Sequence, residues 1–469
     1  MRLDSVGKRF IAALASGVML YFVVGLEPRW FIAWVAPIPL LLAAFQASAA
    51  ETWLLCIVAV GAGFAGNFDY YTKTSGPLGA ILIVLLQVFE WSMAVRFTRS
   101  VVLRTNHWLT IFAWPIAWAA LDTLISTFSP HGTFGSLAYT QMDAWPLIQI
   151  ASITGAAGIV FLFNLFPSAV AIGLFRGAKI KMPSVAYGLP IALLVAALIY
   201  GATRLHNAKT VGQLPVGLVA IDEFIGRETG QESAAAIWDR YADATAELAS
   251  QGARVVVLPE KIAVLMVEEA GTRERQLAEV ARKNQIYLVA GVGISEANGK
   301  RNRAWMFDPT GRLVAEYDKQ HPVPGLEAEF ARGDRFVARD VIGYRAGLAI
   351  CKDMHFATLG RGYGRERVNV VLEPAWDFYV DGWMSVRLAA LRGLESGYSV
   401  VHSARDSFLS VSDRFGRVTD EIRSRRLPGA TLRADVPIGP ATPTPYARIG
   451  DVFGWICVAA GLGLRFKLR

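Results

Sequence analysis

The sequence predicts a chain of two parts, a multi-span α-helical membrane domain and an α/β extramembrane domain. Hydrophobic residues make up 53% of the 469 residues and charged residues only 18%, which is too apolar for an ordinary soluble protein. Most of this hydrophobic excess precedes residue 205, and the remainder looks like a different protein. We therefore expect a transmembrane domain over 1–204, an extramembrane domain over 205–447 and a last transmembrane span within 448–469.

The apolar part contains seven stretches of membrane-spanning length, and an eighth closes the chain. Each is near the ~20 residues that a bilayer demands. The predicted spans are 9–26, 30–47, 52–69, 78–96, 107–127, 146–175, 184–202 and 448–464. Pro167 lies inside the sixth stretch, so we expect that span to be broken or shortened. More spans follow the first stretch directly, which favours an anchor over a cleaved signal peptide.

Basic residues flank these spans unevenly, and this asymmetry predicts their orientation. The loops of one parity and the two termini carry Arg2, Lys8, Arg9, Arg96, Arg99, Arg104, Arg176, Lys179, Lys181, Arg465, Lys467 and Arg469. The loops of the other parity carry only Arg29 and Lys73. Because basic loops stay in the cytoplasm, both termini are expected there and 205–447 on the far side. The net charge of +8 then needs no nucleic acid partner to explain it.

The segment 205–447 alternates short β-branched runs with helical patterns. Apolar runs at 214–221, 254–260, 286–295, 303–309, 312–319 and 341–351 alternate with helical patterns at 230–252 and 272–285. Runs such as VVVL and YLVAGVG are apolar throughout, as expected of strands buried between layers. The alternation therefore predicts a layered α/β domain.

Three of the predicted strands end in a residue that can do chemistry. Glu260 follows VVVLP, Lys319 follows LVAEYD and Cys351 follows GLAI. Taken singly, a solvated carboxylate, a surface lysine and a buried small thiol are the more common explanations. Together, at the ends of three strands of one sheet, they would converge on one patch. There the ammonium would lower the pKa of the thiol and the carboxylate would relay its proton.

These motifs carry a resemblance to a known family. VVVLPE, YDKQHPVPGLE and GLAICKD occur in the order of the Glu-Lys-Cys signature of the nitrilase (carbon–nitrogen hydrolase) superfamily. With the predicted spans, and with 444-TPYARIGDVFGW-455 before the last one, the whole chain resembles the apolipoprotein N-acyltransferase family. The resemblance implies an αββα nitrilase-like sandwich on the periplasmic side of a bacterial inner membrane.

The resemblance also implies catalytic roles. Glu260 would be the general base, Cys351 the nucleophile and Lys319 the cation near the oxyanion, while Glu327 matches a further essential glutamate. A fatty acyl chain would pass from a phospholipid to Cys351 as a thioester, and then to the N-terminal amine of a lipoprotein. The backbone N–H of Lys352 would help to stabilise the oxyanion.

The sequence departs from the family where substrate is handled. Lys352 and Asp353 replace Tyr-Glu after the nucleophile, and Glu373-Pro374 replaces Asn-Asp before Ala-Trp. Lys261 follows the base directly, and a later family motif is rewritten as Tyr398, His402, Arg405 and Asp406. Retention of the triad within altered surroundings predicts thiol chemistry with changed specificity. The predicted substrate-binding residues are Lys352, Asp353, His355, Glu373 and Trp376.

Two further functions remain open from the sequence. Lys352-Asp353 is nearer to the Cys-x-Asp of soluble nitrilases, which favours a membrane-tethered hydrolase in which water discharges the acyl-enzyme. A non-catalytic lipid- or lipoprotein-binding scaffold would keep the fold without a reactive thiol. No cofactor and no metal are expected, because the six histidines form no HxH or HxxxH pair. A monomer in contact with membrane lipid is expected.

Overall fold

A computed structural model describes residues 2–177, 183–226, 228–297 and 299–467. Lys179, Lys181 and Arg469, which enter the orientation argument, lie outside these residues, as do the side chains of Arg465 and Lys467. The chain divides into two compact units. The helical unit is Met1–Ser129, Gly135–Asn207 and Ile449–Arg469, and the catalytic unit is Pro130–Phe134 and Ala208–Arg448.

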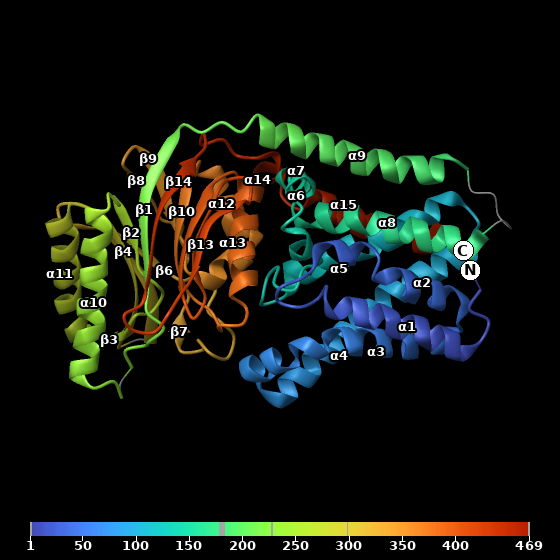
Figure 1. Ribbon diagram of the computed structural model, residues 1–469, viewed down its shortest axis with the longest axis horizontal. Helices are drawn as coiled ribbons and strands as arrows, with labels where there is room; N and C mark the ends of the chain where they lie inside the picture. Colours follow the sequence, from blue (N-terminus) through green and yellow to red (C-terminus); the bar gives the residue numbers. More distant parts are fainter. Residues whose placement is uncertain (1, 178–182, 227, 298, 468–469) are drawn as a thin grey trace. The chain divides into compact units, whose positions relative to one another are not determined.

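The helical unit consists of apolar helices joined by short turns (Figure 1). Its α-helices are α1 (Val6–Tyr21), α2 (Pro37–Gln46), α3 (Ala49–Phe64), α4 (Phe68–Arg104), α5 (Ala113–Phe128), α6 (Trp145–Ile148), α7 (Ala151–Thr154), α8 (Ala156–Arg176), α9 (Val185–His206) and α15 (Val452–Lys467). Short 3-10 helices cover Trp30–Trp34, Ala65–Asn67, Trp108–Phe112 and Leu137–Gln141. Every predicted span overlaps one of these helices.

Four helical stretches of the described chain are long and apolar enough to cross a membrane: Ala49–Arg104, Trp108–Phe128, Ala156–Arg176 and Val185–His206. Trp30–Gln46 and Val452–Leu464 are shorter apolar helices. The number of eight crossings therefore stays a prediction. The sixth span is shortened as expected, but its break lies at Gly155 (φ 66°), whereas Pro167 lies within α8. Gly155 takes a left-handed backbone that ends one helix and starts the next.

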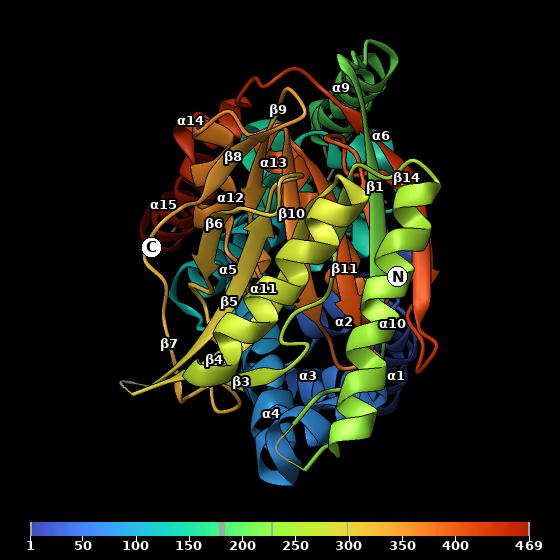
Figure 2. The same cartoon turned by 90° about the vertical axis from the view of Figure 1, so that its left-hand side faces the viewer.

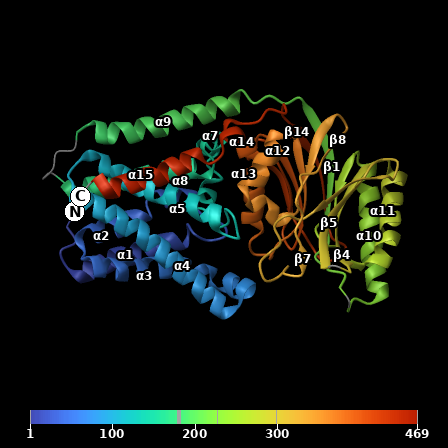
Figure 3. The same cartoon turned by 180° about the vertical axis from the view of Figure 1, so that it is seen from behind.

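Close packing and buried polar pairs hold the helical unit together. An added Cβ at Gly17 on α1 would lie 2.7 Å from the carbonyl oxygen of Ala59 on α3, so only glycine permits this approach. Trp114 Nε1 donates to Asn164 Oδ1 at 2.7 Å between α5 and α8. The beginning of α1 and the end of α15 lie at the same end of this unit (Figures 1 and 3).

The catalytic unit is built on two β-sheets. In the described residues the larger sheet has the order β14-β1-β2-β4-β5-β6, with β3 on β4 and β7 on β5. The smaller sheet has the order β13-β12-β11-β10-β9-β8. The strands are β1 (Gly212–Ala220), β2 (Val255–Val257), β3 (Val264–Met266), β4 (Tyr287–Glu296), β5 (Gly299–Phe307), β6 (Leu313–Asp318), β7 (Phe330–Ala331), β8 (Ala338–Val341), β9 (Tyr344–Leu348), β10 (Val370–Trp376), β11 (Ser399–Arg405), β12 (Phe408–Ser412), β13 (Val418–Arg423) and β14 (Ala430–Ile438).

Helices cover the outer faces of this sandwich, and three hydrophobic cores separate its layers. Helices α10 (Gln231–Ser250) and α11 (Val267–Asn284) lie across the larger sheet, as Figure 2 shows from their side. Helices α12 (Ala357–Arg365) and α13 (Gly382–Ser396) lie on the opposite side of the sandwich (Figure 3), and α14 (Pro445–Ile449) follows β14. One core lies between the two sheets and one under each helix pair. The predicted fold class, apolar helices with an αββα sandwich, is confirmed.

The buried strands end at loops that hold the chemistry. Strands β1, β2 and β4 run parallel, as do β9, β10 and β11. Apolar residues at each of these central positions are buried on both faces. Carboxyl ends of parallel strands meet at one edge of their sheet, so the loops after β2 and β9 are placed where side chains can gather.

Candidate functional site

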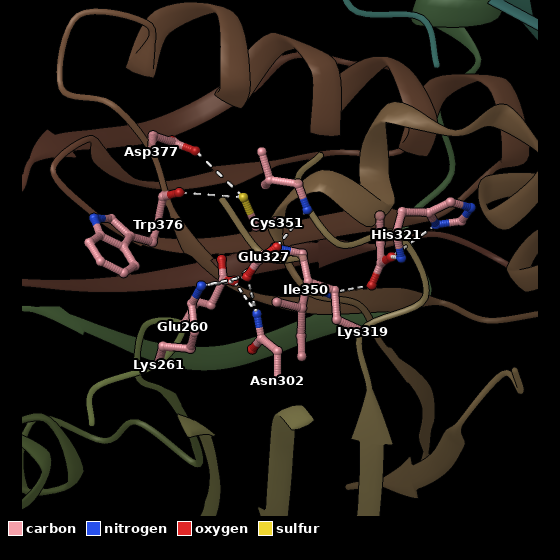
Figure 4. A network of polar contacts seen from close by, with 12 residues as sticks. Glu260, Lys261, Asn302, Lys319, His321, Glu327, Ile350, Cys351, Trp376 and Asp377 are labelled. Carbon is pink, nitrogen blue, oxygen red and sulfur yellow. Dashed lines mark hydrogen bonds and ion pairs between the residues drawn. The ribbon is translucent and has the colours of Figure 1, made fainter. Parts of the chain in front are cut away.

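The three predicted catalytic residues come from both sheets and not from one. Glu260 lies beyond β2 and Lys319 directly beyond β6, strands of the larger sheet, whereas Cys351 lies beyond β9 of the smaller sheet. The expectation of a single sheet was therefore wrong. In the sandwich the two sheets face each other, and the side chains meet across the gap between their strand ends (Figure 4).

An ammonium between two carboxylates forms the centre of the site. Lys319 Nζ lies 2.8 Å from Glu260 Oε1 and 2.9 Å from Glu327 Oε2, and none of the three residues is more than 3% exposed. Burial opposes the charged form of Lys319, but Glu260, Cys351 and Glu327 raise its pKa well above the ordinary value. Burial also acts against ionised Glu327, yet Lys319 and Lys261 hold its pKa far below the ordinary value. Both partners are thus ionised at neutral pH.

Two neighbours complete this charge cluster. Asn302 on β5 donates its side-chain N–H groups to Oε1 of Glu260 and to Oε1 of Glu327, the second at 2.8 Å. Lys261 forms an ion pair with Glu327, and its φ of 44° places it in the left-handed region. Asn302 was not predicted, because its flanking residues Arg301 and Arg303 make the segment look like a solvated strand face.

The nucleophile has a left-handed backbone. Cys351 has φ 45° and opens the 3-10 turn Cys351–His355. Its Sγ donates to the carbonyl oxygen of Trp376 at 3.5 Å and lies 3.9 Å from Asp377 Oδ1. Positive φ at a residue other than glycine costs ~1 kcal/mol or more and is concentrated at functional sites. Asp377 was also not predicted, although it directly follows the end of β10, where a carboxylate in the sequence indicates a candidate site residue.

The thiol is protonated at rest, which differs from the expectation of a lowered pKa. Burial raises the pKa of Cys351 well above its ordinary value, and Glu260 and Asp377 act in the same direction. Lys319 does lower the pKa as expected, but its effect is outweighed. Nucleophilic attack by this thiol therefore requires a base to take its proton.

Asp353 was predicted to contact substrate. In the structure it instead holds the loop of the nucleophile to the neighbouring strand. Its side chain is fully buried. One oxygen accepts from the Tyr317 hydroxyl at 2.7 Å and from the Ile350 N–H at 3.2 Å. The other accepts from the backbone N–H groups of Gln320 at 3.1 Å and His321 at 2.8 Å. No accepting capacity is left for a ligand.

Glu373 is also buried, in a row of charged side chains that leads through His402 and Asp377 to Cys351. Its Oε2 lies 3.0 Å from His402 Nδ1, and His402 Nε2 lies 3.6 Å from Asp377 Oδ2. Burial opposes charged His402, but Glu373 and Asp377 raise its pKa to about 10. Burial raises the pKa of Glu373 to about 7, against the pull of His402. The side chain of Glu373 contacts His402, in place of the predicted direct contact with substrate.

Trp376 forms a wall of the site. Its carbonyl oxygen accepts from the thiol, and its indole Nε1 donates to Asp406 Oδ2 at 2.9 Å. The Arg405 guanidinium lies 3.5 Å from the centre of one indole ring, and the Phe224 ring stacks on it at 5.6 Å. These contacts fix the indole plane beside Cys351, so the altered family motif at 405–406 serves to hold Trp376.

Lys352 and His355 lie in the same turn as the nucleophile. Lys352 is 3% exposed, and its Nζ has no hydrogen-bond partner in the described part of the chain. The loop Pro130–Phe134 covers His355: the Thr133 N–H donates to the His355 carbonyl at 2.9 Å, and the Phe134 ring stacks on the imidazole. The segment Pro130–Phe134 accordingly belongs to the catalytic unit.

Nothing in the described residues is arranged to hold a metal ion. No cluster of three or more His, Cys, Asp or Glu side chains with that geometry occurs in residues 2–177, 183–226, 228–297 and 299–467. Each carboxylate of the central cluster instead contacts an ammonium. The arrangement is suited to acyl transfer through a thiol, because Glu260 and Lys319 are ion-paired and both act electrostatically on the Cys351 thiol.

Comparison with known proteins gives matches in both units. The carbon-nitrogen hydrolase family matches residues 216–400, and the apolipoprotein N-acyltransferase N-terminal domain matches residues 16–169. Apolipoprotein N-acyltransferase from Geobacter metallireducens is 26% identical over 97% of this chain and 94% of its own length. Omega-amidase from Homo sapiens is 35% identical over 27% of this chain and 53% of its own length. A solved amidase from Nesterenkonia sp. AN1 aligns with 48% of this chain and 93% of its own at 20% identity and a TM-score of 0.43.

The two domain matches lie one after the other in the chain, and the near-full-length relatives span both of them. A second relative, apolipoprotein N-acyltransferase from Brucella melitensis, is 24% identical over 88% of this chain and 87% of its own length. The alignments with both relatives continue from the apolar helices into the sandwich, so neither unit is matched in isolation. This chain is a bacterial membrane protein that belongs to the apolipoprotein N-acyltransferase family.

Proposed function

We propose that this membrane N-acyltransferase moves a fatty acyl chain from a phospholipid, through a thioester on Cys351, to the N-terminal amine of a lipoprotein. The observation that carries the proposal is the meeting of Glu260, Lys319 and Cys351 at the edge of the sandwich. The relatives named apolipoprotein N-acyltransferase, which align along nearly the whole chain, support the substrate class.

The first half-reaction needs a base beside the protonated thiol. Glu260 Oε1 is engaged with Lys319 and Asn302, whereas Oε2 is buried and has no hydrogen-bond partner among the described residues. Oε2 takes the thiol proton while sulfur bonds to the ester carbonyl carbon. Lys319 and the Lys352 N–H stabilise the oxyanion. The carbon–oxygen bond then breaks, and Glu260 returns the proton to the departing glycerol oxygen.

The second half-reaction reverses the roles. The lipoprotein amine attacks the thioester carbonyl, and Glu260 removes a proton from the attacking nitrogen. The carbon–sulfur bond breaks, and this proton goes to the Cys351 sulfur, which restores the thiol. No redox group is needed, because neither half-reaction changes an oxidation state.

Intact mass spectrometry after incubation with phospholipid tests the proposal. We expect a mass increase of one acyl chain, absent in Cys351→Ala and retained in Cys56→Ala and Cys457→Ala, which remove the two other thiols. A lipopeptide with a free N-terminal amine should discharge the adduct. Absence of any adduct in the wild type would overturn the proposal.

A hydrolase remains the second candidate. The 35% identity to human omega-amidase within the catalytic unit favours it, as does the Lys352-Asp353 pair. The same experiment separates the two functions by the fate of the thioester. Discharge at equal rates with and without the amine would identify water as the acceptor, and the N-acyltransferase proposal would fail.

The proposed site faces the periplasm, with both termini in the cytoplasm, because the basic loops flank the termini. The start of α1 and the end of α15 lie on one side of the helical unit, which supports this topology. Lys283 on α11 is exposed. In a Cys351→Ala background, Lys283→Cys should react with a membrane-impermeant maleimide in intact spheroplasts. Reaction only after lysis would place the catalytic unit in the cytoplasm instead.

A further inference from the structure

Lys352 presents a buried ammonium that the protein itself does not satisfy. Its Nζ is without a hydrogen-bond partner in the described chain, although the residue is 3% exposed. Burial, helped by Lys319, lowers the pKa of Lys352 to about 8. A buried ammonium without an acceptor is costly, so its retention indicates an acceptor that arrives with a ligand.

The carboxylates nearby are already engaged by other groups. Glu260 and Glu327 contact Lys319, and Glu327 also pairs with Lys261. Asp353, next in the chain, accepts hydrogen bonds on both of its oxygens from the strand and loop beside it. Lys352 therefore has no carboxylate of its own, and an anion entering the site would meet an uncompensated positive charge.

Two imidazoles, those of His355 and His131, are close enough to be influenced by the charge of this ammonium. The Nδ1 atom of His355 is buried and also has no hydrogen-bond partner among the described residues. The loop of the catalytic unit that carries His131 is fixed to the His355 carbonyl by the Thr133 N–H at 2.9 Å and the Thr133 hydroxyl at 2.8 Å. At Gly132 an added Cβ would lie 2.5 Å from that same oxygen, so the loop packs against the turn without a gap.

Both imidazoles are neutral near pH 7. Burial and the charge of Lys352 lower the pKa of His355 well below its ordinary value. Burial and Lys352 also lower the pKa of His131. Both rings are therefore uncharged, and Lys352 supplies the positive charge. One cation beside neutral polar rings fits a singly charged oxyanion with several acceptor oxygens.

We propose that Lys352, His355 and His131 form a subsite for the phosphodiester of the phospholipid acyl donor. The proposal rests on the proposed function and adds the group by which the donor is recognised. In a glycerophospholipid the ester and the phosphate are carried by the same glycerol unit. Lys352 lies in the same turn as Cys351, and its ammonium interacts electrostatically with the thiol, so an ester carbonyl at the sulfur would carry the phosphate towards the ammonium. The subsite binds the phosphate, which all these lipids share, and does not select one head-group alcohol.

A pair of donors that differ only in the phosphate tests this subsite. Thioester formation on Cys351 is measured by intact mass with a phospholipid and with the diacylglycerol of the same acyl chains, both in the same detergent micelles. The readout is the ratio of the two second-order rate constants. We expect Lys352→Met to reduce the preference for the phospholipid about tenfold or more, since a hydrogen bond to a charged group is lost.

Matched variants separate charge at the subsite from charge elsewhere. Lys352→Arg keeps the positive charge and should retain most of the preference, whereas Lys283→Met removes the same charge from the exposed surface of α11 and should leave the ratio unchanged. Equal losses with both donors in Lys352→Met, with the ratio preserved, would overturn the phosphate subsite. A wild type that forms no thioester with either donor would instead overturn the proposed function.

Competition in the wild type decides the case in which Lys352→Met forms no adduct at all. Glycerophosphocholine has the phosphodiester without acyl chains. We expect it to inhibit thioester formation from the phospholipid competitively, and glycerol at the same concentration to leave the rate unchanged. Absence of inhibition by glycerophosphocholine at concentrations above that of the donor would overturn the subsite.

Discussion

His402 Nδ1 lies 3.0 Å from Glu373 Oε2, and the two residues occupy the same register position on the parallel strands β11 and β10. On its other side the imidazole approaches Asp377, whose second oxygen lies 3.9 Å from the Cys351 sulfur. A row of alternating charges therefore connects the interior of the smaller sheet with the nucleophile. Glu373 and His402 are both positions at which the sequence was expected to depart from the pattern of the family.

Loss of one member of this buried row should destabilise the protein. We expect Glu373→Gln to lower the free energy of unfolding by about 3 kcal/mol, because the His402 charge is left with Asp377 as its one carboxylate partner. Thermal unfolding in detergent measures the change. Glu279→Gln, which removes a carboxylate from an exposed pair with Arg282, is the matched control and should leave the unfolding temperature unchanged. Equal effects of the two variants would contradict the prediction.

The charge of His402 should make stability depend on pH. Burial opposes it, but Glu373 and Asp377 raise the pKa of His402 to about 10, against about 6.5 in an unfolded chain. The folded state then holds a proton that the unfolded state releases, so this stabilisation is complete below pH ~6.5 and is lost as the pH rises to ~10. Unfolding temperatures across this window should fall more steeply for the wild type than for His402→Gln. Parallel curves would contradict the assignment.

Glu260→Gln should separate thiol reactivity from catalysis. Glu260 is one of the groups that raise the pKa of Cys351, so its neutralisation should move the pH midpoint of Cys351 alkylation by iodoacetamide downward. Acyl transfer should fall by a factor of about 10²–10⁴, because the base is lost. Alkylation and single-turnover thioester formation measure the two effects on one preparation. An upward shift of the alkylation midpoint would show that Glu260 does not face the sulfur as an anion.

Asn302 should matter for rate more than for folding. Its amide donates to both Glu260 and Glu327, and it is 1% exposed. We expect Asn302→Leu, of similar volume, to slow thioester formation by about tenfold or more, because the base loses a donor that orients it. The unfolding temperature reports the structural cost. Full rate retention in a variant that folds normally would remove Asn302 from the site.

The catalytic residues were predictable because each stands where a buried strand stops. Glu260, Lys319 and Cys351 each follow a predicted strand, and the change from apolar residues to residues with reactive side chains is visible in a single sequence. Which sheet each strand joins is not visible, because pairing depends on residues far apart in the chain. This is why Cys351 was placed on the same sheet as Glu260.

Other residues escaped prediction because their partners are distant in sequence. Asp353 was taken as a ligand contact, yet Tyr317 and His321 saturate its oxygens, and no local pattern shows this. Asn302 looks like any polar strand residue until Glu260 and Glu327 are placed around it. The contact between Thr133 and His355 joins segments 222 positions apart. The break at Gly155, in contrast, could have been read from glycine's conformational freedom.

The bonds of Asp353 have a mechanical consequence. Tyr317 belongs to the larger sheet and Ile350 follows a strand of the smaller one, and both donate to this single buried carboxylate. The sheets are thereby locked against sliding at the point where Lys319 and Cys351 project. In the proposed reaction, this connection would keep the positions of Lys319 and Cys351 fixed relative to each other. The exchange of acyl donor for acceptor would then depend on movement of the substrates and not of the two sheets.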